Sequence, residues 1–182
     1  MDLRRAFDVL LSRRDVDPRR IAYIGHSYGA QWGAILSAVD KRMKTSILIA
    51  GVRASEDMWE TSNSPDSVKL RQEWPLATRS PYMKRYTAVD GVRYVPHAAP
   101  VALYFQFAQF ERDFDVASMN GYFEAASQPK TISWYPTGHE LNDPHAWADR
   151  ARWLAQQIGL ERAPAVLQAW VSGKELRLPR SD

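Results

Sequence analysis

The sequence predicts an α/β fold with a mainly parallel sheet of about four strands and helices on both of its faces. Short apolar runs rich in branched residues alternate along the chain with segments whose apolar residues recur at helical spacing. The 182 residues suffice for one sizeable core, and 45% hydrophobic with 25% charged residues is ordinary for a globular protein. We therefore expect a single domain over residues 1–182.

The first fifty residues show this alternation clearly. Leu3, Phe7, Leu10 and Leu11 recur at helical intervals, and small residues around Gly33 are typical of a helix that packs closely on a sheet. The expected elements are a helix over the first dozen residues, a strand over 20–24, a helix over 30–39 and a strand over 45–51.

Residues 52–100 form a different kind of segment. Prolines and aromatic side chains stand among charged residues there, and short helices are expected over residues 67–73 and 81–86. Because flexible linkers are poor in tryptophan, we interpret the segment as a helical, lid-like insertion.

Beyond the insertion the alternation resumes. Asp143 and Pro144 predict the start of a helix, with the aspartate as N-cap and the proline at the first helical position. The expected elements are a strand over 101–107, a helix over 116–126, a strand over 130–135, the helix that begins at 144, and one further helix near 165–171 in a C-terminal tail over 160–182.

A G-x-S-x-G pentapeptide, Gly25-His26-Ser27-Tyr28-Gly29, lies between the first expected strand and its helix. A serine in so tight a strand-to-helix turn has a strained backbone, and glycines allow the two elements to approach closely. This placement is typical of a serine nucleophile held at the tip of a turn. The alternative is an ordinary turn residue.

Acidic residues and a histidine follow the next strands, where the carboxyl ends of a parallel sheet gather. His139 is predicted to take the proton of Ser27, unless it is a loop histidine bonded to the backbone, and an acid would orient its ring. Glu111 is the preferred acid because it comes four residues after the end of a strand; Asp113 is the second choice. The backbone N–H of Tyr28 would donate to an oxyanion.

Other histidines are assigned no catalytic role. We expect the side chain of His26 to leave its strand on the face opposite Ser27, His97 to fix a loop, and His145 to face water. These positions supply no metal site, and the absence of cysteine excludes thiolate ligands. We expect neither a metal nor another cofactor.

The net charge of +3 is scattered along the chain, so no face for nucleic acid is expected. No apolar stretch approaches the length that spans a bilayer, and the N-terminus lacks the apolar core of a signal peptide. The expected location is the cytoplasm, without membrane association.

Three stretches, residues 23–30, 94–100 and 134–143, resemble the C-terminal part of bacterial dienelactone hydrolase-like and prolyl oligopeptidase-like α/β-hydrolases. The resemblance reaches from the first helix to about Leu160. It implies an α/β-hydrolase fold, ester or peptide-like acyl substrates, a Ser-His-acid triad and no cofactor. It also supports Glu111, although the family's usual acid is an aspartate that follows a Gly-x-x pattern.

The same resemblance implies a chain of reduced size. Family members have further strands, and a loop that supplies a second oxyanion donor, before the helix that precedes the strand leading to Ser27. We expect a serine esterase that cleaves small carboxylic esters through an acyl-enzyme. The alternative is a catalytically weak or inactive truncated hydrolase that acts as a binding or oligomerising module. The strand that leads to Ser27 would present an open edge, through which two copies could pair as a homodimer.

Overall fold

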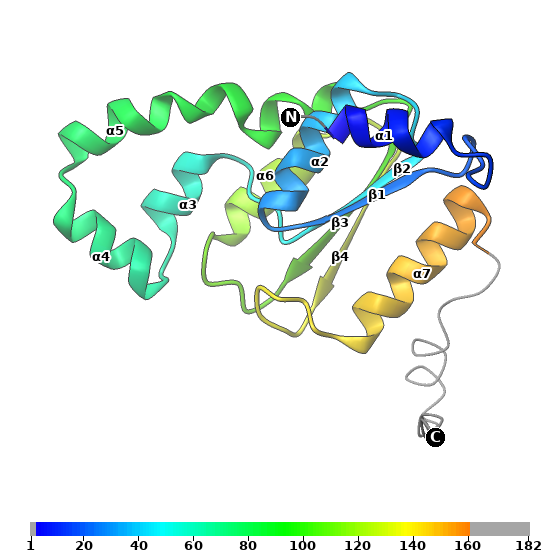
Figure 1. The fold of residues 1–182 in the computed structure, drawn as a ribbon. Helices are drawn as coiled ribbons and strands as arrows, with labels where there is room; N and C mark the ends of the chain where they lie inside the picture. The colour runs from blue at the N-terminus through cyan, green and yellow to red at the C-terminus, as the bar shows by residue number, and fades with distance from the viewer. Residues whose placement is uncertain (1–2, 161–182) are drawn as a thin grey trace, which may run out of the picture.

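A parallel sheet of four strands forms the centre of the computed structural model, which describes residues 3–160 (Figure 1). The strands lie side by side in chain order, β1-β2-β3-β4, and each neighbouring pair is parallel. They are β1 (Ala22–His26), β2 (Thr45–Ile49), β3 (Ala102–Ala108) and β4 (Lys130–Tyr135). The α-helices are α1 (Leu3–Ser12), α2 (Tyr28–Val39), α3 (Ser55–Thr61), α4 (Pro65–Glu73), α5 (Leu76–Lys84), α6 (Val116–Ala125) and α7 (Pro144–Ile158).

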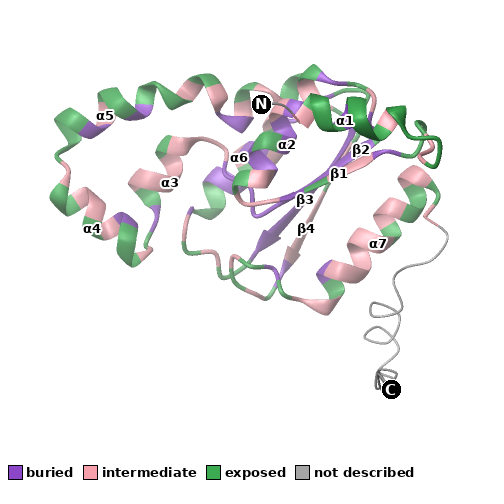
Figure 2. Ribbon diagram, viewed as in Figure 1, coloured by how far each residue is buried: buried purple, intermediate pink, exposed green. Residues whose placement is uncertain are grey.

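Alternation along β3 places apolar side chains on both faces of the sheet. Leu103, Phe105 and Phe107 belong to the core cluster on the α2 and α6 face, whereas Tyr104 and Ala108 belong to the cluster under α7. All seven residues of β3 are buried (Figure 2). A central strand that is buried on both faces is the expected consequence of parallel pairing with helices on each side, so the predicted fold class is confirmed.

Among residues 3–160, the strand β1 pairs with β2 alone and therefore forms one edge of the sheet. Helix α7 covers β2 and β3. Ile24, in the middle of β1, pairs in register with Ile47, which belongs to the core cluster under α7. Ile24 itself is not covered by that helix, and 49% of its surface is exposed. The edge strand therefore offers both unpaired backbone and an apolar side chain.

The segment after β2 is helical, as expected for an insertion. Helices α3, α4 and α5 form an arm that extends beyond the carboxyl ends of the strands (Figure 1). The expected helix start at Pro81 was wrong: α5 begins after Pro75, whose fixed φ of −58° suits a helix entry, and Pro81 lies inside it. Three short 3₁₀ turns, Tyr86–Val89, Gly91–Arg93 and Val95–His97, then return the chain to β3.

The last described helix, α7, begins as its sequence predicts. The Asp143 carboxylate accepts hydrogen bonds from the N–H groups of His145 and Ala146, and Gly159 ends the helix in the left-handed conformation. The helix expected at 165–171 and most of the 160–182 tail lie outside the described residues. Among residues 3–160, none of the helices combines the length and apolar character needed to cross a bilayer.

Candidate active site

Ser27 occupies a sharp turn directly between β1 and α2. Its φ of 55° and ψ of −116° lie outside the regions that residues with a Cβ normally adopt. Three main-chain hydrogen bonds hold it: Ser27 N–H donates to the carbonyl of Ile49, and Ser27 C=O accepts from Ala30 and Gln31. The strain is thus held by the neighbouring strand and by the first turn of α2.

The two glycines of the pentapeptide have unequal steric roles. A Cβ at Gly25 would lie 2.2 Å from the carbonyl oxygen of Gly29, a distance that no side chain tolerates. A Cβ at Gly29 would meet only the Tyr23 hydroxyl, at 3.8 Å. The close approach of strand and helix at this turn therefore requires glycine at 25. Gly33 has the same role further along α2, where a Cβ would lie 2.6 Å from the Tyr23 ring.

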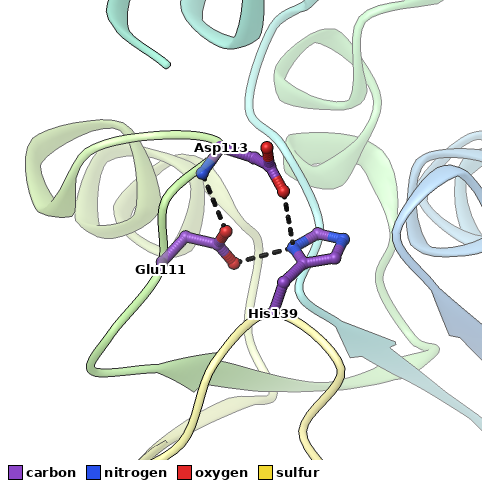
Figure 3. A group of neighbouring side chains, drawn as sticks. All are labelled: Glu111, Asp113 and His139. Atoms are coloured by element: carbon purple, nitrogen blue, oxygen red, sulfur yellow. Dashed lines mark hydrogen bonds and ion pairs between the residues drawn. The ribbon is translucent and has the colours of Figure 1, made fainter. Parts of the chain in front are cut away.

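His139, in the loop after β4, is joined to Glu111 in the loop after β3. Its Nδ1 lies 2.9 Å from Glu111 Oε2, and the Glu111 side chain is 1% exposed (Figure 3). The other carboxylate oxygen, Oε1, accepts the backbone N–H groups of Arg112 and Asp113 at 3.0 Å. The loop itself therefore fixes the carboxylate that orients the imidazole.

Asp113 approaches the same nitrogen from a second direction (Figure 3). Its Oδ2 lies 3.6 Å from His139 Nδ1, which is beyond hydrogen-bond distance. Its side chain is also more exposed than that of Glu111. Asp113 consequently adds negative charge beside the ring, whereas Glu111 makes the direct contact.

These contacts alter the proton affinity of the imidazole. Burial on its own lowers the pKa of His139, but the hydrogen bond and charge of Glu111, with the charges of Asp113 and Glu140, outweigh it. The net pKa lies above its ordinary value of 6.5. With Nδ1 donating to Glu111, Nε2 of the neutral ring is the nitrogen that can accept a proton.

Ser27 and His139 line one small cavity of about 40 Å³. Its walls also include Tyr28, Met58 from α3, and Asp113. As the first residue of α2, Tyr28 has a backbone N–H without an intrahelical acceptor. The sequence-predicted residues thus come from three loops at the carboxyl edge of the sheet. All of them but Glu111 line this cavity, and Glu111 contacts His139.

His26 has a contact that sequence reasoning missed. Its Nε2 lies 2.9 Å from the main-chain carbonyl oxygen of His139, and the two rings meet edge to face with centroids 5.0 Å apart. The loop after β4 thus contacts the side chain of His26 and also lines the cavity of Ser27. His97 lies in the 3₁₀ turn before β3, where its main-chain carbonyl accepts a hydrogen bond from Lys41. His145 is exposed, as expected.

The ligand atoms of Glu111, Asp113 and His139 lie within 4.8 Å of one another, so a divalent cation is the other occupant that this group could take. In the structure, however, His139 Nδ1 and Glu111 Oε2 are hydrogen-bonded directly, and Glu111 Oε1 is occupied by two N–H donors. A cation would have to replace the hydrogen bond that orients the imidazole.

No protein-family model and no curated protein matches the chain in sequence. Solved structures do match it in fold. An acetyl xylan esterase from Paenibacillus sp. R4 aligns with a TM-score of 0.72 at 20% identity over 84% of this chain and 50% of that one. An α/β-hydrolase from Penicillium sp. sh18 gives 0.67 at 15% identity over 86% and 70%.

A 2,6-dihydroxy-pseudo-oxynicotine hydrolase aligns with a TM-score of 0.68 at 14% identity over 94% of this chain and 46% of that one. The chain therefore spans about half the length of two of these three proteins. At such low identity the likeness concerns the fold, in which the strand-turn-helix at Ser27 and the loops after β3 and β4 occupy one edge of the sheet.

Proposed function

Because the chain has the α/β-hydrolase fold, we propose that it is a serine hydrolase that cleaves small carboxylic esters at Ser27. The observation that carries the proposal is the cavity shared by Ser27 and His139, with the His139 imidazole bound to the buried Glu111 carboxylate. Esterases among the proteins of similar fold support an ester as the substrate.

In this mechanism Ser27 Oγ attacks the ester carbonyl carbon while Nε2 of His139 takes the hydroxyl proton. Glu111 holds the ring and stabilises the imidazolium, and the N–H of Tyr28 donates to the oxyanion. The tetrahedral intermediate then collapses, and the departing alkoxide takes the proton from His139. Water, deprotonated by the same imidazole, then attacks the acyl carbon. The bond to Ser27 Oγ breaks, the carboxylic acid leaves, and His139 returns the proton to Ser27 Oγ.

A fluorophosphonate probe tests the nucleophile directly. We expect intact mass spectrometry to show one adduct on the wild-type protein and none on Ser27→Ala, with turnover of p-nitrophenyl acetate lost in the same variant. Ser46, which is buried in β2, provides a control, because Ser46→Ala leaves Ser27 in place and should still react with the probe. An adduct that persists on Ser27→Ala would refute the proposed nucleophile.

A second candidate function follows from the open edge of β1. A folded but catalytically weak hydrolase would serve as an oligomerising module if the edges of two copies paired, which would cover Ile24 and complete the backbone hydrogen bonds of β1. Because losing an oxyanion donor costs about 10²–10³ in turnover, weak activity would accompany this role if Tyr28 is the sole donor. Light scattering that shows a monomer at micromolar concentration would exclude it.

A further inference from the structure

A second, larger cavity adjoins the candidate active site. It measures about 190 Å³ and lies between α2 and the helices of the insertion. Tyr28 lines both this cavity and the small one that holds Ser27 and His139. A ligand in the larger cavity would therefore be in contact with the residue that directly follows the candidate nucleophile.

Aromatic side chains dominate the walls of this cavity. Two come from α2, one from α3, and two from the end of α5 and the following turn: Tyr28, Trp32, Trp59, Tyr82 and Tyr86. Four of these five are at least 39% exposed. Large apolar side chains that remain exposed around one hollow are typical of a ligand site, because folding alone would favour burying them.

Several polar groups on the walls already have protein partners. Gln31 donates to the carbonyl of Val89, Ser55 donates to the Asp90 carboxylate, and the hydroxyls of Tyr82 and Tyr86 bond each other at 2.8 Å. None of the described residues that line the cavity is charged. The cavity therefore suits a neutral, largely apolar group rather than a carboxylate or a phosphate.

The volume limits the size of that group. An apolar protein cavity of about 150 Å³ holds one benzene ring, so about 190 Å³ accommodates a single ring with a short substituent. Aromatic contacts already exist at the wall that Tyr82 and Tyr86 form. The centroids of these two rings are 5.3 Å apart, and the Tyr82 ring also contacts Trp74, with centroids 5.0 Å apart. A flat ring can continue these edge and face contacts.

We propose that the cavity binds one neutral aromatic ring of the substrate, joined by a short linker to an ester carbonyl that enters the small cavity beside Ser27. The statement that the ring belongs to a substrate rests on the proposed hydrolysis at Ser27. The binding of an aromatic ring in the cavity does not. The cavity at Ser27, about 40 Å³, is too small for a ring, so the linker must pass Tyr28. The ring belongs to either the acyl or the alcohol portion of the ester, and the turnover experiment below distinguishes the two.

Binding is tested first in the Ser27→Ala variant, which cannot turn the ligand over. Methyl 3-phenylpropanoate, methyl 3-cyclohexylpropanoate and benzyl acetate are titrated while tryptophan fluorescence is recorded. We expect saturable binding of at least one phenyl compound, at least about threefold tighter than the cyclohexyl compound, because only a flat ring makes the aromatic contacts. Equal or absent binding of all three compounds would overturn the inference.

Turnover by the wild-type protein then identifies which portion of the ester carries the ring. We compare kcat/KM for ethyl esters of acetate, phenylacetate, 3-phenylpropanoate and 4-phenylbutanoate, and for benzyl acetate against ethyl acetate. A maximum within the phenyl series assigns the ring to the acyl portion, whereas preference for benzyl acetate assigns it to the alcohol. A series that shows no preference for a ring in either portion contradicts the inference.

Variants on one helix provide the matched control. Trp32→Ala removes a wall of the cavity, and we expect the phenyl-to-acetate ratio of kcat/KM to fall about tenfold. Val39→Ala on the same helix removes a similarly exposed side chain away from the cavity and should leave the ratio unchanged. If a phenyl compound binds to Ser27→Ala but the wild-type protein turns over no ester, the proposed hydrolase is refuted and the aromatic site is supported. If the wild-type protein hydrolyses acetate esters but no phenyl compound binds, the aromatic site is refuted and the proposed hydrolase is supported.

Discussion

The imidazole of His26 binds the main-chain carbonyl oxygen of His139, with 2.9 Å between Nε2 and the oxygen. A carbonyl oxygen only accepts, so His26 Nε2 carries the proton of this hydrogen bond. The residue directly before Ser27 thus fixes the backbone of the loop that presents the His139 ring. Glu111 orients that ring, and His26 holds the main chain that carries it.

From this contact we predict that His26→Ala lowers kcat for the proposed ester hydrolysis by about tenfold to a hundredfold, because a small displacement of the proposed base, His139, is costly. KM should change little. His26→Gln, whose amide can still donate to the carbonyl, should recover some of the loss. Steady-state kinetics of the two variants check this, and equal kcat in both would contradict a positioning role for the donor.

The pH dependence of hydrolysis distinguishes the two carboxylates near His139. The imidazole must be neutral to accept the Ser27 proton, and its pKa is raised, so kcat/KM should fall as the pH drops through a value above 6.5. Glu111→Gln removes the largest upward contribution, so the acidic limb should move to lower pH while kcat also falls. Asp113→Asn should move the limb less and retain more of kcat.

A larger effect of Asp113→Asn on both the acidic limb and kcat would reverse the roles of the two carboxylates, with Asp113 in place of Glu111 as the main partner of His139. Neither substitution changes the side-chain size greatly, so the comparison reports on charge. Far-UV circular dichroism and an unfolding curve for each variant establish that the fold is retained at every pH in the profile.

The strained backbone of Ser27 should be measurable as lost stability. A residue held in so unfavourable a region costs about 1–3 kcal/mol, whereas glycine adopts it freely and loses about 0.5–1 kcal/mol through the greater entropy of the unfolded chain. We therefore predict that Ser27→Gly unfolds with a free energy about 1 kcal/mol greater than Ser27→Ala, which keeps the Cβ. Urea denaturation of both variants provides the test, and an alanine variant at least as stable would argue against strain.

Tyr122 provides a second stability prediction. Its hydroxyl is fully buried without a hydrogen-bond partner among the described residues, and burial raises its pKa. An unpartnered buried hydroxyl costs about 1–3 kcal/mol, so Tyr122→Phe should increase the free energy of unfolding by about 1 kcal/mol. Tyr104→Phe serves as the matched control: its hydroxyl bonds Tyr135 and Ser133, so that variant should be destabilised.

Local signals in the sequence account for most of the fold that could be predicted. The β4 strand has the predicted bounds, and α7 begins at the Asp143 cap, because apolar runs and capping residues act within a few positions. The helices of the insertion were placed less well. Pro81 resembles a helix start in sequence, but Pro75 is the residue that the surrounding chain uses, and no local signal distinguishes the two.

Within the site, chain order and the parallel topology were enough to bring Glu111, Asp113 and His139 to one edge. They could not separate the two acids, because a loop of five residues can turn either carboxylate toward the ring. The contact between His26 and His139 was missed for a related reason: it joins residues far apart in the chain and depends on the conformation of the loop after β4. Strand parity alone indicates only the face on which His26 lies.

The position of β1 at the edge of the sheet has a thermodynamic consequence. Among the described residues, the five-residue strand β1 has one unpaired edge, contains the His26 donor and leads directly into the turn at Ser27. Any strand that docks on this edge and thereby changes the position of β1 would also change the affinity of Ser27 for its ligand. By linkage, the ligand would alter the affinity of the docked strand by the same factor. The outer edge of β1 is therefore the place at which a binder would act as an effector of the site.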